Sequence, residues 1–407
     1  MENIVFKFMK YLNILYSDIR KNLRFYLLAF SLVASTIAFI PNGLFFYLLG
    51  VIYLFMMSSR QKRNSCSMAS TYILFLTACY ISVIVSSAWN YRILVFTLTI
   101  LACTSFWNSK SLFNFRKKYL YYCLNIFPIL SIGCLFCYYA GINMFVAEEG
   151  DVSWDFSAFF PHPMWMGAAV GLGNVVLTWH VLHTNNKKHK ILFGLILLGS
   201  IMITVVSGSR TALFASLTAI IILLFTFSTS FWKLLKIVFV VSLLASVTLP
   251  FYVSKSARMM AKFEAGKDEK YGSRTERWES QYAKFKDNPI FGNGFAVNYY
   301  NGYRVIGRSE SGSGWLSILF QTGVIGAVGM CVIMIPVIKR RKYLKSNDEF
   351  KLIYCTFTFL CFHSVTEGYI LTAGYYLCIL FWTEIGYILS FPKFNIKYRK
   401  YEYKRIP

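Results

Sequence analysis

Residues 314–338 read GWLSILFQTGVIGAVGMCVIMIPVI, a run that contains no Lys, Arg, Asp or Glu. As a helix rising about 1.5 Å per residue, this run is long enough to cross the roughly 30 Å hydrocarbon core of a bilayer. Comparable runs recur from Phe25 almost to the C-terminus. Of the 407 residues, 56% are hydrophobic and only 15% are charged, whereas soluble domains carry about 25% charged residues. The sequence therefore predicts an all-α, polytopic integral membrane protein in which residues 1–407 form a single transmembrane domain.

Polar or charged residues separate these runs into about twelve predicted membrane spans. The ninth and tenth are joined by residues 255–313, a loop far longer than usual connections, and such loops are commonly functional or disordered. The first twenty residues lack the pattern of a cleavable signal peptide and predict a cytoplasmic helix that leads into the first span. The predicted spans are residues 25–40, 44–58, 68–87, 93–107, 119–141, 162–183, 191–208, 212–230, 236–254, 314–338, 352–370 and 374–391.

The distribution of basic residues predicts the orientation of these spans. With the N-terminus in the cytoplasm and the sides alternating, the cytoplasmic segments hold 29 of the 42 Lys and Arg residues, and the outer segments hold 13. This is the positive-inside bias that sets the topology of membrane proteins. The net charge of +24 then reflects topology and attraction to anionic membrane lipid, and we do not expect nucleic acid as a partner. Both termini are predicted to be cytoplasmic, and residues 255–313 periplasmic.

Within the large loop, one stretch has the periodicity of a helix. Trp278, Tyr282 and Phe285 recur at i, i+4 and i+7, so they share one helical face, while the charged residues of 274–287 fall elsewhere. Asn288 and Pro289 end this helix, and a Gly/Asn-rich turn follows at 291–295. We expect an amphipathic helix that covers a site at the outer surface.

Arg210 is the most informative single residue. It lies between the apolar runs 191–208 and 212–230, with no acidic residue nearby in the sequence. A guanidinium at the edge of the hydrocarbon needs an anionic or carbonyl partner. It either extends to the lipid headgroups or binds phosphate through two parallel N–H donors. Arg277 and Arg274 add cations on the same predicted side, although each of them alone is typical of a solvated helix face.

Three motifs resemble those of the O-antigen ligase/polymerase family. Residues 207–212 (SGSRTA) resemble its S-x-S-R-T motif at the start of a span. Residues 274–295 are similar to the R-x-x-x-W and N-P-hydrophobic-G-x-G patterns of its large periplasmic loop, through RTERW at 274–278 and NPIFGNG at 288–294. Residues 313–326 resemble the segment that leads into the next span. The motifs extend from 207 to 326, and upstream of them only the layout of the spans matches.

The resemblance implies a glycosyltransferase of the bacterial inner membrane with a periplasmic active site. Family members take a glycan from an undecaprenyl diphosphate carrier and pass it to a hydroxyl acceptor, which is lipid A-core for the ligases and another carrier-linked repeat unit for the polymerases. Arg210 and Arg277 match the family's diphosphate-binding arginines, and we add Arg274 from its position on the predicted helix. Because arginines stabilise the leaving diphosphate, neither a metal ion nor a cofactor is expected. A polysaccharide chain-length regulator is the implied protein partner.

One departure from the family pattern favours a polymerase over a ligase. The ligases have a His-Asn pair eleven residues before the glycine that corresponds to Gly323, and that His is thought to activate the acceptor hydroxyl. This sequence has Gly312 and Ser313 at those positions. Glu310 is the nearby residue able to act as a general base at neutral pH. We therefore expect a polymerase of O-antigen, capsular or exopolysaccharide repeat units, with Glu310 as a candidate base.

Four further residues are candidates for the site. His162 lies where the sixth span begins on the outer side, and it either contacts substrate or has a structural role. His363 and Glu367 lie at i and i+4 of the eleventh span, so we expect them to face the same way, as a catalytic pair or as a mutually neutralising pair. Trp315, together with Trp278, is a candidate for stacking on sugar rings.

Two alternatives to a polymerase remain open. A ligase would have the same fold and donor but a different acceptor. A lipid-linked oligosaccharide flippase belongs to another class of protein, in which two related halves usually carry charges at the membrane midplane. The sequence shows one dominant outer loop and no detectable internal repeat, which favours an enzyme over a transporter.

Overall fold

The computed structural model of the chain is mainly helical, with 75% of the described residues in helices and 3% in strands. It describes residues 17, 20–40, 43–59, 68–145, 156–228, 232, 275–300, 303–307 and 312–394. The helices are residues 20–34, α2 (Gly43–Ser59), α3 (Ala69–Val85), α4 (Arg92–Cys103), α5 (Lys110–Ala140), α6 (Pro163–His183), α7 (Lys187–Val206), α8 (Arg210–Phe227), α11 (Thr275–Phe285), α12 (Gly314–Lys339), the short 3₁₀ helix η1 (Arg340–Tyr343), α13 (Asp348–His363) and α14 (Tyr376–Phe394), and the strands are β1 (Val297–Tyr300) and β2 (Tyr303–Ile306).

The helix lengths and compositions support a multi-pass membrane protein. Six stretches within the described residues are long and apolar enough to cross a membrane, and α2, α3 and α4 are shorter apolar helices. Large apolar side chains such as Ile84, Phe136 and Leu195 are exposed on α3, α5 and α7, as expected where helices face lipid. The predicted span 236–254 lies outside the described residues. The total of twelve spans therefore stays a prediction.

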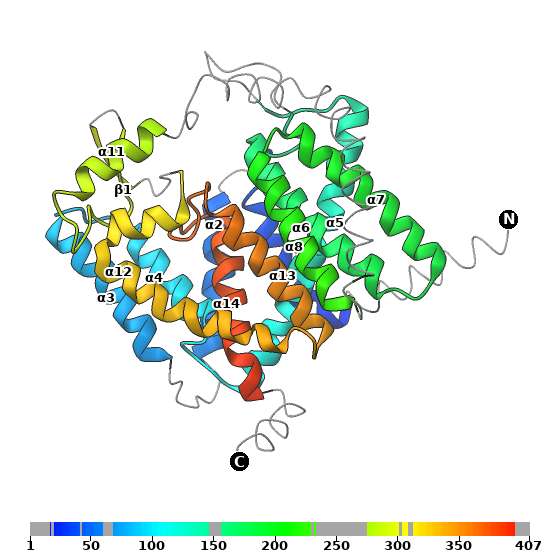
Figure 1. Cartoon of the computed structure of the whole chain (residues 1–407), viewed down its shortest axis with the longest axis horizontal. Coiled ribbons are helices and arrows are strands. Elements are labelled where there is room, and N and C mark those ends of the chain that lie inside the picture. The colour runs from blue at the N-terminus through cyan, green and yellow to red at the C-terminus, as the bar shows by residue number, and fades with distance from the viewer. Residues whose placement is uncertain are drawn as a thin grey trace.

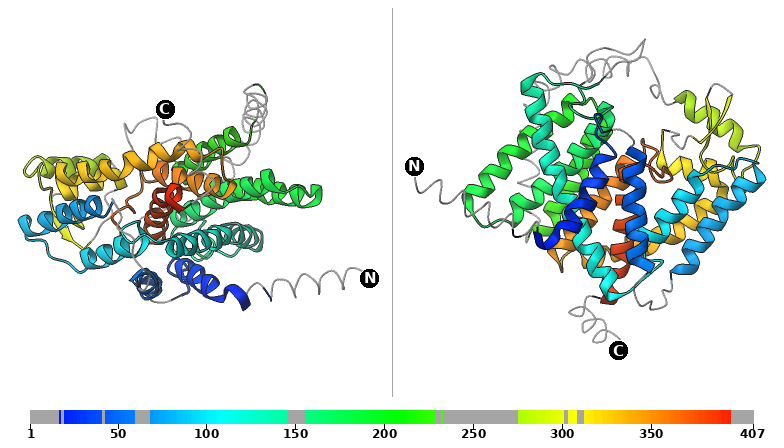
Figure 2. Two further views of the ribbon diagram at one scale, coloured as in Figure 1. Left: turned by 90° about the horizontal axis from the view of Figure 1, so that it is seen from below. Right: turned by 180° about the vertical axis from the view of Figure 1, so that it is seen from behind.

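The helices form three groups across the molecule. Figures 1 and 2 show α5 to α8 on one side and α3, α4 and α12 on the other, with α13 and α14 between them. Within the first group, α6 packs against α5, α7 and α8, and α13 joins this group to α14 through contacts with α6 and α8. On the other side, α12 packs along α3. The helix at 20–34 and α2 lie across the face seen in the right-hand view of Figure 2.

Helices α6 and α14 are central, because side chains all round both of them are buried. Small residues let the neighbours of α6 approach its backbone. A Cβ on Gly171 would lie 2.8 Å from the Phe359 ring of α13, and one on Gly173 would overlap Ser131 of α5. Neither glycine therefore has room for a larger side chain.

Two departures from the predicted spans shape the outer part of the molecule. The predicted span 352–370 ends early, because α13 stops at His363 and residues 364–375 are not helical. The predicted span 314–338 is interrupted at Gly323, which has φ +69° and ψ −171°. Figure 1 accordingly shows α12 as two segments that run in different directions. The predicted loop 255–313 also contains a two-stranded antiparallel hairpin, β1–β2, where no strand was predicted.

Candidate active site at the outer helix ends

The non-helical segment 364–375, between α13 and α14, contacts the N-terminal ends of three helices. The Thr366 hydroxyl donates a hydrogen bond of 2.6 Å to the Thr211 hydroxyl at the start of α8. The Gly314 N–H at the start of α12 donates to the Ser364 carbonyl at 2.7 Å. The rings of Tyr375 and Trp165, in the first turn of α6, have centroids 4.7 Å apart. We call this meeting point of the starts of α6, α8 and α12 with residues 364–375 the outer junction, after the side of the membrane on which the sequence predicts it to lie.

Arg210 is the first residue of α8, and the residues before it fix where that helix begins. The Ser209 hydroxyl accepts a hydrogen bond from the Ala212 N–H at 3.4 Å, which caps the helix. Gly208 precedes the cap with φ +64°, a conformation that favours glycine. A Cβ on Gly167 of α6 would lie 2.7 Å from the Ser209 side chain, so α6 packs directly on this turn. The Arg210 side chain is exposed at the edge of this packed turn.

The outer junction has the electrostatics of an anion site. Each helix N-terminus carries the equivalent of about +0.5 charge from the backbone dipoles, and residues 364–375 contact three such ends, one of which begins with Arg210. Phosphate groups commonly bind where helix N-termini and arginine coincide. Arg210 and Glu367 are each one residue away from the Thr211–Thr366 hydrogen bond, so this bond places the candidate phosphate ligand and a candidate base beside the same contact.

His162 and the pair His363 and Glu367 lie around this junction, but not as the sequence suggests. The Nδ1 of His162 accepts a hydrogen bond from the Met164 N–H at 3.1 Å, so this histidine caps the start of α6. His363 is buried between the rings of Phe359 and Tyr369, with centroid distances of 5.4 and 5.7 Å. Because α13 ends at His363, the prediction that His363 and Glu367 share one helical face is wrong. Glu367 is half-buried in the segment that follows the helix.

The amphipathic helix predicted in the large loop is confirmed as α11, although its inner face differs from the prediction. Trp278 and Phe285 face inward, and Phe285 packs against Phe320 of α12 with ring centroids 5.8 Å apart. Tyr282 is instead 52% exposed, and the buried residue of that turn is Gln281. The Gln281 amide donates to the Asn298 side chain of β1 at 3.3 Å. A polar anchor to the hairpin therefore replaces the third aromatic contact.

The position of α11 separates Arg277 from Arg210. Figure 1 shows α11 over β1 and α12 and apart from α8, and Arg277 is exposed on it. The predicted convergence of three arginines is therefore not seen in the described part of the chain. Arg274 and Glu310 lie outside the described residues. Of the predicted diphosphate ligands, Arg210 alone is placed at the outer junction among the residues described.

The turn 289–294 packs into the break of α12. The Asn293 and Gly294 N–H groups donate to the carbonyls of Phe320 and Gln321 at 2.8 and 3.1 Å, and the Val324 N–H donates back to the Pro289 carbonyl at 3.0 Å. A Cβ on Gly323 would lie 2.1 Å from the Ile290 carbonyl oxygen. The loop motif thus supplies the backbone partners that the broken helix lacks, which is a structural reason for its glycines.

Trp315 has a packing role at the start of α12. Its indole N–H donates to the Cys361 carbonyl of α13 at 3.0 Å. It also borders an apolar cavity of about 710 Å³ between α8, α12 and α13, which follows α13 from Tyr354 to Phe362 and reaches Val365 beside the outer junction. The ring is therefore held against the bundle, and the sugar-stacking role predicted for it stays untested, as it does for Trp278.

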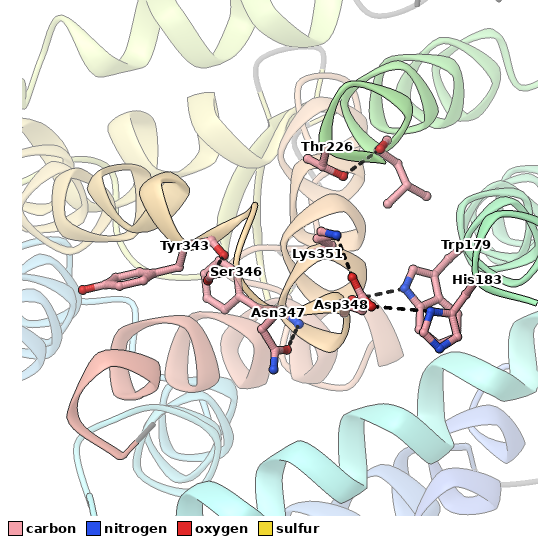
Figure 3. A network of polar contacts seen from close by, with 10 residues as sticks. Trp179, His183, Thr226, Tyr343, Ser346, Asn347, Asp348 and Lys351 are labelled. Atoms are coloured by element: carbon pink, nitrogen blue, oxygen red, sulfur yellow. Dashed lines mark hydrogen bonds and ion pairs between the residues drawn. The ribbon is translucent and has the colours of Figure 1, made fainter. Parts of the chain in front are cut away.

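A second polar cluster lies where the C-terminal end of α6 meets the N-terminal end of α13, away from the outer junction (Figure 3). Asp348 accepts a hydrogen bond from Lys351 at 2.6 Å and lies 3.6 Å from Nδ1 of His183, while its carbonyl accepts from the Trp179 indole at 3.1 Å. The ring of His183 stacks on Trp179 with centroids 4.6 Å apart. These contacts join the two helices at the end away from Arg210.

Comparison with known protein families agrees with the motif positions. Residues 193–331 match the family model described as O-antigen ligase. Across these residues the chain is similar to the O-antigen ligase/polymerase family. The family consists of glycosyltransferase-like membrane enzymes and includes both ligases and polymerases. No curated protein was found to match this chain.

The region that matches the family model contains Arg210, Arg277 and Glu310 but ends before residues 364–375. The segment that joins the three helix ends was missed by sequence reasoning, because 352–370 and 374–391 were interpreted as nearly continuous spans. Ser, Thr and Gly recur in 364–374 (SVTEGYILTAG), and this composition is a signal of irregular backbone within an apolar region.

Proposed function

We propose that this protein is a polysaccharide polymerase that joins undecaprenyl-diphosphate-linked repeat units on the periplasmic face of the bacterial inner membrane. The observation that carries the proposal is the outer junction, where Arg210 begins α8 beside the N-termini of α6 and α12. A diphosphate is the group that such an arrangement recognises best, because backbone N–H groups and a guanidinium both favour phosphate oxygens.

The apolar cavity beside the junction supports a lipid-linked donor. It reaches Val365, one residue before the Thr366 hydroxyl that bonds to Thr211, and its other lining residues are mainly aliphatic and aromatic. An isoprenoid chain requires such an apolar path, and its diphosphate requires a polar end next to that path. In this proposal, the carrier tail lies along α13 while its diphosphate lies at Arg210.

The reaction follows from these positions. A hydroxyl oxygen of the acceptor forms a bond to the anomeric carbon of the donor sugar, and the bond between that carbon and the diphosphate oxygen breaks. The bonding electrons leave with undecaprenyl diphosphate, whose growing negative charge is stabilised by Arg210 and the helix N-termini. The hydroxyl proton passes to a base, for which Glu310 is the first candidate and the residues His363 and Glu367 are the second. Arg277, Arg274 and Trp278 belong to the large loop and, in this proposal, contact the donor from the outer side.

The residues at 312 and 313 favour a polymerase over a ligase. Ser313 caps α12, with its hydroxyl accepting from the Leu316 N–H at 3.3 Å, and it stands where the ligases are expected to carry a residue of the His-Asn pair. Gly312 has φ +77° and offers no side chain for proton transfer. A ligase remains the second candidate, because the matching family model is described as O-antigen ligase.

Elongation of purified carrier-linked repeat units by the purified protein in lipid vesicles tests the proposal. We expect a ladder of lipid-linked polymer on a gel, in step with release of undecaprenyl diphosphate. Transfer of a glycan only to added lipid A-core would identify a ligase. Movement of the carrier across the vesicle without a new glycosidic bond would identify a flippase. Either of these results would overturn the polymerase assignment.

A further inference from the structure

A basic cavity of about 580 Å³ lies where the helix at 20–34, the end of α2 and the start of α5 meet. Three cations line it, Arg24, Lys110 and Lys118, together with the polar side chains of Ser111 and Asn114. No acidic residue is among its described lining residues. The cavity is far along α5 from the outer junction and takes no part in the proposed glycosyl transfer.

Within the described residues, no acidic partner neutralises these three cations, whereas two neighbouring cations on α5 have other partners. Lys117 pairs with Glu349 at 2.5 Å, and Arg116 is buried and donates to the Trp107 carbonyl at 3.0 Å. In the part of the chain that the structure describes, Arg24, Lys110 and Lys118 form no ion pair with a carboxylate. Their positive charge is therefore not neutralised within the described fold.

One aromatic ring holds two of these cations at the cavity. The Arg24 guanidinium carbon lies 4.9 Å from the centroid of Phe25, and the Lys118 Nζ lies 5.9 Å from the same ring. Cations at these distances are attracted to the face of the ring. Because Phe25 is buried against Phe115, with ring centroids 5.2 Å apart, the ring is a fixed support for both charges.

The start of α5 adds a second source of positive potential. Lys110 is the first residue of this helix, and the Ser109 hydroxyl accepts from the Leu112 N–H at 3.1 Å. The cavity thus combines three cations, two polar side chains and the positive end of a long helix. Oxygen-rich anions such as phosphate are the ligands that this set recognises.

The apolar walls identify the source of the phosphate. Phe25, Met57 and Phe115 line the remaining part of the cavity, at the ends of the apolar stretches of three helices. A phospholipid has the same division, with a charged phosphate next to apolar chains, and basic pockets between helices at the cytoplasmic side bind such headgroups. We propose that the basic cavity binds the phosphate of an anionic phospholipid from the inner leaflet of the membrane.

Native mass spectrometry of the intact protein in detergent tests this lipid site. Phosphatidylglycerol is titrated against phosphatidylethanolamine with the same acyl chains. Wild type is compared with the triple variant Arg24→Gln, Lys110→Gln, Lys118→Gln. The matched control carries Lys187→Gln, Lys188→Gln and Lys190→Gln, which remove the same charge from the start of α7. We expect wild type and control to retain phosphatidylglycerol preferentially, and the cavity variant to lose roughly tenfold to a hundredfold of that affinity.

Two outcomes would overturn the proposal. Equal losses in the two triple variants would show that net charge alone attracts the lipid. Displacement of phosphatidylglycerol by inorganic phosphate at equal concentration would show a site for a soluble anion rather than for a lipid. If the triple variant does not yield folded protein, the single variants Arg24→Gln and Lys118→Gln are compared with Lys188→Gln, and loss of a fewfold in affinity is expected only for the first two.

Discussion

Arg210 illustrates how neighbouring residues can position a single side chain for the role proposed for it. Ser209 ends the preceding turn by capping α8, Gly208 supplies a positive φ, and Gly167 of α6 leaves the space for that turn to pack. Because a fixed turn precedes it, the guanidinium starts from a defined position at the helix N-terminus. Fixed donors stabilise developing charge more effectively than mobile ones, since they need no rearrangement during the reaction.

Replacing Arg210 tests whether it binds the diphosphate through its planar fork. We expect Arg210→Lys to lower the rate of polymerisation by roughly a hundredfold or more, nearly as much as Arg210→Ala, because an ammonium keeps the charge but loses the two parallel donors. The measurement is polymer formed per unit of membrane-inserted protein. Arg92→Lys, at the start of α4, is the control and should have little effect. Near-normal polymer from Arg210→Lys would reduce this residue to a cation at the headgroups.

A second test concerns the base that accepts the hydroxyl proton. If Glu310 has this role, Glu310→Gln should lower the rate by about a hundredfold while the protein level in the membrane is unchanged, and Glu310→Asp should retain part of the activity. Glu279→Gln, an exposed position on α11, is the matched control. Unchanged polymer length in Glu310→Gln would assign the proton to His363 with Glu367, or to the departing diphosphate.

At the residue scale, the sequence singles out Arg210 as a candidate site residue, but it does not predict which residues surround it in the fold. Its position between two apolar runs indicates an anionic or carbonyl partner without any structure. The Thr211–Thr366 contact joins residues far apart in the chain, and no local pattern predicts it. The same limit explains Gln281, because only the position of β1 determines that an amide, and not Tyr282, faces inward on α11.

At the scale of elements, the apolar runs that predict α12 and α13 are longer than the continuous helices that form, because α12 is broken at Gly323 and α13 ends at His363. An apolar run shows which residues can lie in the membrane, but it does not show where the backbone leaves the helical conformation. In α12 the break is stabilised by hydrogen bonds from 289–294, and after α13 the connection 364–375 bonds to α8 and α12. Tertiary partners therefore decide both boundaries.

Gly323→Ala tests the break in α12. A Cβ at this position would overlap the Ile290 carbonyl, and alanine disfavours φ +69°. We expect a loss of about 1 to 3 kcal/mol in stability, seen as a lower midpoint of thermal unfolding and lower activity. Gly194→Ala is the matched control, because a Cβ on Gly194 in α7 meets no atom within 4 Å. Equal unfolding midpoints for the two variants would show that the break tolerates a side chain.

At the scale of the whole molecule, the distribution of charge predicts the orientation of the helices, and the packing of the helices determines where the two polar sites lie. The positive-inside bias predicts which ends of the helices face the cytoplasm. The packing then places the outer junction at one end of α6 and the cluster around Asp348 at the other end. Helix α13 connects the two, because it packs along α6. The sequence could predict the two sides, whereas the meeting of α6, α8 and α12 depends on contacts that only the folded chain contains.

Enzyme fusions test the predicted orientation. Alkaline phosphatase, which is active only outside the cytoplasm, should be active when fused after Lys267 and inactive when fused after Lys345. The expected difference follows from the 29 basic residues in the predicted inner segments against 13 in the outer ones. Each fusion is normalised to its protein level. Activity only after Lys345 would reverse the orientation and place the outer junction on the cytoplasmic side.

The ribosome makes residues 289–294 before it makes α12, so the partner of the break is complete when Gly323 is synthesised. Backbone groups left unpaired in lipid cost several kcal/mol each, and α12 therefore gains its stable form only after that turn has reached its final side of the membrane. If the chain were divided before Thr275 into two co-expressed fragments, the C-terminal fragment would enter the membrane with both partners of this contact in one polypeptide. A division between Ile306 and Gly314 would instead separate the broken helix from its partner during insertion.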